Sequence, residues 1–292
     1  MKKIVLIIGN GFDLDLGLKT RYIDFVNSKR YWPQGEQIQK NVYRKQGLLA
    51  FLNDKAKSDN WFDLERSLKE FATSTSEYLD FKYNRYNGKD ESIQLFNELT
   101  RKLSLFIKKR EKNDKLKNRS FASYVISKCM YFNKIYTFNY TDINHLAERL
   151  GYSTSCNVVH IHGSIKENSI ILGVDGGSTL LPDYGFLRKT ISKNYKSNYL
   201  NRDLKDADEV IFFGFSFSKI DFGYFSEFFN SLLEQEKRKT IIVITKDNDS
   251  IYDIKSRIED EGISLSRLYE KTDFRCYAVS DKLDYDEVLQ FK

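Results

Sequence analysis

The chain opens with a short apolar run that stops at a glycine turn. Residues 4–8 are Ile-Val-Leu-Ile-Ile, and Gly9-Asn10-Gly11 follow directly. Five apolar residues are too few for a buried helix, and their β-branched bias favours a central strand buried on both faces. Apolar residues then return in a helical pattern between Leu14 and Val26. The stretch therefore predicts a strand, a tight turn and a helix, which is the opening unit of a nucleotide-binding α/β fold.

Two interpretations of the glycine turn are open. Glycine has no Cβ, so the backbone N–H groups of residues 9–11 could approach a phosphate, and the start of a following helix would favour that anion. A tight turn between a strand and a loop, with no ligand, explains the same glycines equally well.

Strand patterns return in the second half of the chain. The β-rich runs are residues 134–138, 157–161, 169–173, 209–213 and 240–245, with 274–279 as a further candidate. Helical patterns lie between several of them, as at residues 142–150 and 222–233. Apolar strands alternating with helices predict an α/β fold with a mostly parallel, Rossmann-like sheet that carries helices on both faces.

Residues 35–118 interrupt this alternation. Aromatic and leucine side chains recur there at steps of three and four, the spacing of amphipathic helices whose apolar face packs in a core: Trp61, Leu64, Leu68, Phe71, and then Phe96, Leu99, Leu103, Phe106. We therefore expect a nucleotide-binding core made of residues 1–34 and 119–292, with a helical insertion at residues 35–118.

Charge and cysteine content limit the class of protein. The net charge of +6 at pH 7 is compatible with anionic ligands or nucleic acid but requires neither. We interpret the Lys-rich run at 108–119 as a solvated helix end and loop, with nucleic-acid contact as the less favoured alternative.

Three widely spaced cysteines, Cys129, Cys156 and Cys276, predict reduced thiols rather than a zinc module or disulfides. No apolar run reaches the roughly 18 residues of a membrane span, so we expect a cytoplasmic protein without membrane contact.

Polar and glycine residues follow four of the predicted strands. Ligands of open α/β sheets bind beyond the carboxyl ends of the strands, so these groups would converge on one crevice if the strands are parallel neighbours. The candidates are Gly9, Asn10, Gly11, Phe12 and Asp13; Thr137 and Asn139; His162; and Gly214, Ser216 and Asp221.

Two of the three histidines, His160 and His162, follow the same predicted strand and would point to one face of it. No acidic or cysteine pair accompanies them, so we expect no metal. We interpret His160 as a structural residue. His162, directly before Gly163, is the functional candidate because histidine can exchange a proton near neutral pH.

In order, the motifs IIGNGFDLDLGLKTRYIDF, TFNYTD, HIHG and GFSFSKID resemble the AbiH family of bacteriophage abortive-infection proteins over nearly the whole chain. More distantly, the same places are similar to the sirtuin NAD-binding fold. Gly9, Gly11 and Gly17 keep its glycine spacing, and residues 137–139 resemble its TQN motif. His162 precedes a glycine as the sirtuin catalytic histidine does, and residues 214–216 resemble its glycine-x-serine.

Departures from the sirtuin pattern matter for the expected chemistry. Asp13 replaces a small hydroxyl residue near the expected phosphates, and Thr141 stands where the motif has an acid. The zinc ribbon of peptide-deacylating sirtuins is missing from the sequence. The resemblance therefore favours action on the dinucleotide alone over protein deacylation.

The resemblance implies an antiphage effector that binds NAD and hydrolyses its nicotinamide–ribose bond. Asn139 would position water or the ribose hydroxyls, and His162 would be the base. Residues 9–11 and Ser216 would cradle phosphate and ribose, while Asp13 and Asp221 would bind hydroxyls or hold the loops. The expected partners are NAD or a related nucleotide, a phage trigger or partner protein, and other copies of the chain.

Two other functions stay open. Thr141, which stands where the sirtuin motif has an acid, and Asp13 are compatible with a non-catalytic module. Such a module would sense a nucleotide and act through a partner or by assembly. The basic run at 108–119 is compatible with a nuclease, although no carboxylate cluster has an obvious metal-binding spacing.

Overall fold

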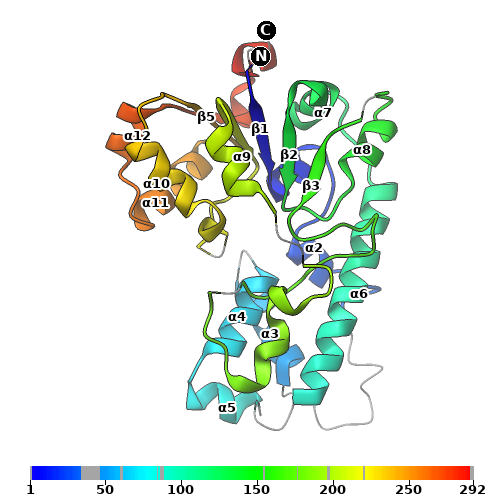
Figure 1. The fold of residues 1–292 in the computed structure, drawn as a ribbon. Helices are drawn as coiled ribbons and strands as arrows, with labels where there is room; N and C mark the ends of the chain where they lie inside the picture. Colours follow the sequence, from blue (N-terminus) through cyan, green and yellow to red (C-terminus); the bar gives the residue numbers. More distant parts are fainter. Residues whose placement is uncertain are drawn as a thin grey trace. The chain divides into compact units, whose positions relative to one another are not determined.

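The computed structural model in Figure 1 describes residues 2–33, 47–59, 62–83, 85, 89–153, 155–175, 177–195, 198–219 and 221–289. The chain forms two compact units. The sheet unit comprises Met1–Lys19, Asn113–Ile161 and Ser197–Lys292, and the helical unit comprises Thr20–Lys112 and His162–Lys196. The helical unit thus contains residues 162–196 as well as most of the predicted insertion, whose bounds stay a prediction.

The sheet unit is built on one parallel sheet of six strands within the described residues. Its strands are β1 (Ile4–Ile8), β2 (Lys134–Thr137), β3 (Val158–His160), β4 (Glu209–Phe213), β5 (Thr240–Thr245) and β6 (Asp273–Ala278). They follow the order β3-β2-β1-β4-β5-β6, and every pairing is parallel. This arrangement confirms the predicted parallel, Rossmann-like α/β fold.

Helices cover both faces of the sheet, as predicted (Figure 1). Leu6 and Ile8 of β1 pack with α1 (Asn10–Asp15), α7 (Phe121–Ser127), α8 (Ile143–Arg149) and α13 (Tyr285–Leu289). Val5 and Ile7 point the other way and pack with α9 (Leu200–Asp206), α10 (Ser226–Glu234), α11 (Asn248–Asp260) and α12 (Leu265–Lys271). The strict alternation along β1 explains why its whole run is apolar: each face meets its own layer of helices.

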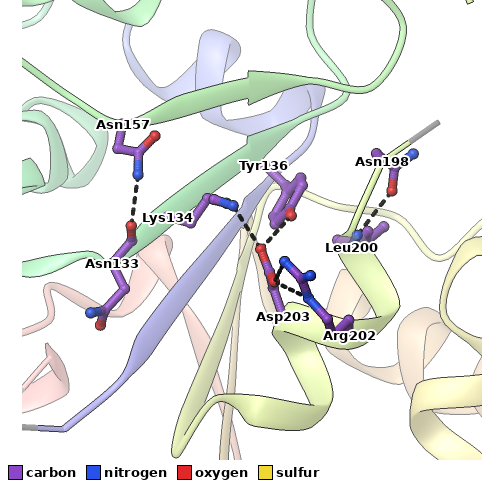
Figure 2. A network of polar contacts seen from close by, with 8 residues as sticks. All are labelled: Asn133, Lys134, Tyr136, Asn157, Asn198, Leu200, Arg202 and Asp203. Atoms are coloured by element: carbon purple, nitrogen blue, oxygen red, sulfur yellow. Dashed lines mark hydrogen bonds and ion pairs between the residues drawn. The ribbon is translucent and has the colours of Figure 1, made fainter. Parts of the chain in front are cut away.

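A carboxylate joins helix α9 to strand β2 (Figure 2). Asp203 of α9 accepts a hydrogen bond from the Lys134 ammonium at 2.8 Å and one from the Tyr136 hydroxyl at 2.7 Å. Arg202 approaches its second oxygen at 3.1 Å. These contacts hold the helix that precedes β4 against the strand next to β1.

The helical unit contains α2 (Tyr22–Val26), α3 (Gly47–Ser58), α4 (Leu64–Thr73), α5 (Glu77–Tyr83) and all but the last residue of α6 (Lys89–Asn113). It also holds the 3-10 turns Pro182–Leu187 and Lys189–Ile191. The predicted aromatic and leucine faces are largely buried, as at Leu68, Phe71, Leu103 and Phe106. Trp61 lies outside the described residues. Among the residues described, no helix combines the length and apolar character needed to cross a bilayer.

Two of the predicted elements are wrong. Residues 169–173 form no strand, because their backbone turns back on the preceding loop: Ser169 N–H donates to Ser164 O and Ile171 N–H to His162 O. The predicted helix between Leu14 and Val26 is also interrupted. Gly17 has φ +99°, a conformation outside the helical region, and the chain re-enters a helix only at Tyr22.

The prediction of three reduced cysteines is wrong for two of them. Cys129, after α7, forms a disulfide with Cys156, before β3, with 5.4 Å between their Cα atoms. The two are 27 residues apart in sequence. They meet because α7, α8 and the β2–β3 pair pack in one apolar cluster, which cysteine spacing alone does not reveal.

Candidate functional site

The carboxyl ends of β1 and β4 mark the place where the direction of the strand order changes. The chain runs outward from β1 through β2 to β3, and then from β4 through β5 to β6 on the other side. Such a switch point is where doubly wound sheets bind ligands. Residues 9–13 follow β1, residues 214–221 follow β4, and Thr137 and Asn139 lie at the end of neighbouring β2. The sheet unit therefore contains every candidate residue except His162, and these residues all follow β1, β2 or β4.

The glycine turn after β1 packs directly against the backbone after β4. Gly9 N–H donates to Phe213 O at 3.0 Å, and Gly11 N–H donates to Gly214 O at 2.9 Å. A Cβ on Gly9 would lie 2.6 Å from Gly214 O, and one on Gly11 would lie 2.6 Å from Gly214 Cα. The interpretation of the turn without a ligand thus accounts for both glycines, since their N–H groups already donate to carbonyl oxygens.

Asp13 ties the same turn to the end of β2. Its carboxylate accepts from Asn139 Nδ2 at 2.8 Å and from Thr141 Oγ1 at 3.1 Å. The side chain is only 2% exposed, and a buried carboxylate needs such donors to offset its lost hydration. The acid and the threonine that depart from the sirtuin pattern are therefore hydrogen-bonded to each other.

Asn139 has a structural role at this point. Its amide nitrogen Nδ2 also donates to Gly9 O at 3.0 Å, so its two hydrogens serve Gly9 and Asp13. This leaves the carboxamide oxygen to accept a hydrogen bond from a ligand hydroxyl or water. Thr137 is fully buried and its hydroxyl accepts from Asn139 N–H at 3.1 Å, so it shapes the turn that presents Asn139.

The loop after β4 has an unusual backbone. Gly214 has φ +63° and Phe217 has φ +50°, which is uncommon for a residue with a side chain. Phe215 and Phe217 are buried, whereas Ser216 between them is exposed. Arg257 of α11 donates to Ser216 O at 2.7 Å. These contacts fix the backbone on either side of the exposed Ser216.

Asp221 closes the loop after β4. Its carboxylate accepts a hydrogen bond from the Ser218 hydroxyl at 2.9 Å, and its N–H donates to Ser218 O at 2.9 Å. Asp221 thus forms hydrogen bonds within the loop after β4, and its expected role toward a ligand stays a prediction.

His162 belongs to the helical unit, where it contacts the ammonium of Lys189, which in turn faces two carboxylates. Lys189 Nζ is 3.2 Å from its Nε2, and the same ammonium lies 3.0 Å from Glu65 Oε2 and 3.4 Å from Asp175 Oδ1. Burial, together with the charge of Lys189, lowers the pKa of His162 well below its ordinary value. Sequence reasoning missed Lys189, Glu65 and Asp175, because nothing in their local pattern connects them with a histidine 13 to 97 positions away.

The remaining histidine of the HIHG motif is explained by a backbone contact. His160 ends β3, and its Nδ1 lies 3.2 Å from Asn139 O. Gly163 has φ +73°, and a Cβ there would collide with Ser169 O, so packing alone requires this glycine.

Among the described residues, no three His, Cys, Asp or Glu side chains gather in a group that could hold a metal ion.

The family model described as bacteriophage abortive infection AbiH matches residues 5–244, which include every candidate residue discussed above. No curated protein matches the chain.

Proposed function

Because this chain belongs to the AbiH family of bacteriophage abortive-infection proteins, we propose that it is an antiphage effector which binds NAD and hydrolyses the nicotinamide–ribose bond. A phage trigger or partner protein, and self-assembly, are the interactions that we expect to control it. Depleting NAD would stop the metabolism of an infected cell, which is the outcome that abortive infection requires.

The strand order is the observation that carries this proposal. The order β3-β2-β1-β4-β5-β6 is the one found in dinucleotide-binding folds, and its switch point lies between β1 and β4. The candidate residues of the sheet unit follow these two strands and β2. The exposed Ser216 and the carboxamide oxygen of Asn139 are groups suited to ribose hydroxyls.

The proposed reaction needs a water, a base and a neutral leaving group. Water attacks the anomeric carbon of the ribose while the carbon–nitrogen bond breaks through an oxocarbenium-like state. The electron pair of that bond goes to the pyridinium nitrogen, so nicotinamide leaves uncharged. The proton lost by water goes to the base, the role proposed for His162, and Asn139 would orient the water or the ribose.

Nicotinamide release by the purified protein is the direct test. We expect His162→Ala to abolish release and Asn139→Ala to reduce it by roughly 10²-fold or more, because general base catalysis and orientation each contribute on that scale. His145→Ala, which removes the histidine of α8, is the control and should retain activity. Since Asn139 also binds Gly9 and Asp13, circular dichroism must show that its variant is folded. Undiminished release by folded His162→Ala or Asn139→Ala would remove that residue from the mechanism.

An experiment in infected cells covers the case of a purified protein that is inactive without its trigger. If the isolated protein releases no nicotinamide, the NAD level is measured in phage-infected cells that carry it, with His162→Ala cells as the control. A fall in NAD confined to the wild type supports the proposal. A steady NAD level in cells that the wild-type protein is killing would overturn it.

A non-catalytic nucleotide-sensing module is the second candidate. The observation that favours it is the double use of Asn139, whose amide hydrogens hold Gly9 and Asp13 instead of a ligand. Calorimetry that detects NAD binding, with NAD recovered intact afterwards under triggering conditions, would support this function over hydrolysis.

A further inference from the structure

The helical unit buries a lysine among charged groups drawn from distant parts of the chain. The side chain of Lys189, in the 3-10 turn Lys189–Ile191, is 1% exposed. Glu65 comes from α4, Asp175 from the segment after Gly173, and His162 from the start of the segment 162–196. Burying an ammonium is strongly unfavourable unless charged partners face it, and here the carboxylates of Glu65 and Asp175 are those partners.

The two carboxylates determine which residue is the donor in the hydrogen bond between Lys189 and His162. Glu65 at 3.0 Å and Asp175 at 3.4 Å favour the charged form of Lys189. A charged lysine has three N–H donors and no acceptor. The imidazole atom 3.2 Å away, Nε2, must therefore accept this hydrogen bond.

We propose that Lys189 is a positioning residue for His162: by donating to Nε2, it holds the imidazole neutral, in the tautomer whose hydrogen is on Nδ1. A hydrogen on Nε2 would point at the ammonium, so the other tautomer and the doubly protonated ring are both disfavoured at this contact. Lys189 thereby decides which ring nitrogen is a donor and which is an acceptor.

The catalytic meaning of this contact rests on the proposed function. In the proposed hydrolysis, His162 would stay neutral through the physiological pH range, and its Nε2 would reach water only by exchanging the hydrogen bond from Lys189. Both the burial of His162 and the charge of Lys189 lower the pKa of the ring, in agreement with the geometry. The negative charges of Glu65 and Asp175 face Lys189 in the same cluster and limit the effect of its charge.

Nuclear magnetic resonance of the full-length protein tests the tautomer without any need for catalysis. Histidine is labelled with ¹⁵N, and two-bond ¹H–¹⁵N spectra are recorded between about pH 5 and 8, the range in which ordinary histidines titrate. His162→Gln assigns the signals among the three histidines. We expect the wild-type His162 signals to have the Nδ1–H pattern and to stay constant. An Nε2–H pattern, or a titration near the ordinary pKa of about 6.5, would overturn the proposal.

Variants of the cluster separate positioning from folding. Lys189→Met removes the ammonium that faces Glu65 and Asp175, so the double variant Lys189→Met/Glu65→Gln, which also removes the charge of Glu65, is measured beside it. In whichever of the two is folded, His162 should lose its fixed tautomer and titrate at higher pH than in the wild type. Lys189→Arg, which keeps a charged donor, should retain the wild-type Nδ1–H pattern of His162. Lys166→Met, at an exposed lysine of the same unit, is the control and should change nothing. An unchanged His162 spectrum in the folded double variant would show that Lys189 does not position the ring.

The two proposals fail in different ways. If the wild type shows the Nδ1–H pattern but neither the protein nor infected cells consume NAD, the tautomer assignment stands and the hydrolase does not. If nicotinamide is released, the pH dependence of kcat adds a second readout. We expect kcat to gain a new ionisation in the folded Lys189 variant, and a variant profile identical to that of the wild type would separate Lys189 from catalysis.

Discussion

Gly214 has the tightest steric constraint of the glycines in the turns directly after β1 and β4. Its φ of +63° lies in the left-handed region, and a Cβ built there would collide with Phe12 N and the backbone of Gly11. Gly9 and Gly11 meet the same peptide from the other side. Each of the three glycines therefore leaves space for the backbone of the others, and together they allow the loops after β1 and β4 to come into contact.

Gly214→Ala should lower the free energy of unfolding by about 2 kcal/mol or more, because the new methyl group adds both backbone strain and overlap with Phe12. Urea unfolding followed by circular dichroism measures the change. Gly223→Ala is the matched control, since a Cβ at Gly223 meets no atom within 4 Å, and it should stay within about 0.5 kcal/mol of the wild type. Equal stability of the two variants would contradict the close approach of the two loops.

At the scale of elements, one carboxylate provides the polar contacts that join α9 to β2 (Figure 2). Burial alone would raise the pKa of Asp203, but hydrogen bonds from Lys134, Tyr136 and Arg202 outweigh it and lower the pKa. The same contact, with burial as the larger cause, raises the pKa of the Tyr136 hydroxyl. The ionised form of Asp203 is thus the one that stabilises the folded state.

Asp203→Asn should reduce stability at pH 7 by about 1.5 to 3 kcal/mol, the range for a hydrogen bond to a charged group. Since the folded pKa lies below the unfolded value of about 3.9, this contribution is complete above pH 5 or so and is lost as the pH falls through the folded pKa. Urea unfolding at about pH 7 and pH 3 measures the difference, which should shrink on acidification. Asp206→Asn, at an exposed position of the same helix, should be nearly neutral at both pH values. A difference for Asp203→Asn that is independent of pH would show that its charge is not the cause.

At the scale of the whole molecule, the family match extends over segments of both compact units. The proposed hydrolysis requires the native protein to bind NAD, and the sensing function requires it to bind NAD or a related nucleotide. Any ligand that binds only the folded state raises its stability, by about 2.7 kcal/mol at a concentration 100-fold above Kd.

NAD should therefore raise the melting temperature of the folded His162→Ala variant, which cannot consume the ligand in the proposed reaction. A rise of several degrees that increases with NAD concentration is expected, because stabilisation by mass action grows with the logarithm of ligand concentration. Differential scanning fluorimetry measures it, and inorganic pyrophosphate at equal concentration is the control for a merely ionic effect. No rise in this variant at millimolar NAD would count against both the hydrolase and the sensing module as NAD-binding proteins.

Local sequence patterns determined most of the sheet unit. The apolar runs within β1, β4 and β5 are unbroken because both faces of each strand are buried, and a residue's place in such a run is a local property. The rule that ligands bind at strand ends then selected residues 9–13, 137–139 and 214–221. These segments do lie at the carboxyl ends of neighbouring strands in the observed sheet.

Only the tertiary structure decided what these residues touch. Gly9 and Gly214 are 205 positions apart, and their contact exists because β1 and β4 pair. The hydrogen bonds from Asn139 to Asp13 and from Lys189 to His162 likewise join segments that no periodic pattern relates. A sequence pattern indicates that a polar side chain will be buried away from water, but not which group will form a hydrogen bond with it there. The partner depends on strand order and loop closure, and these are properties of the whole fold.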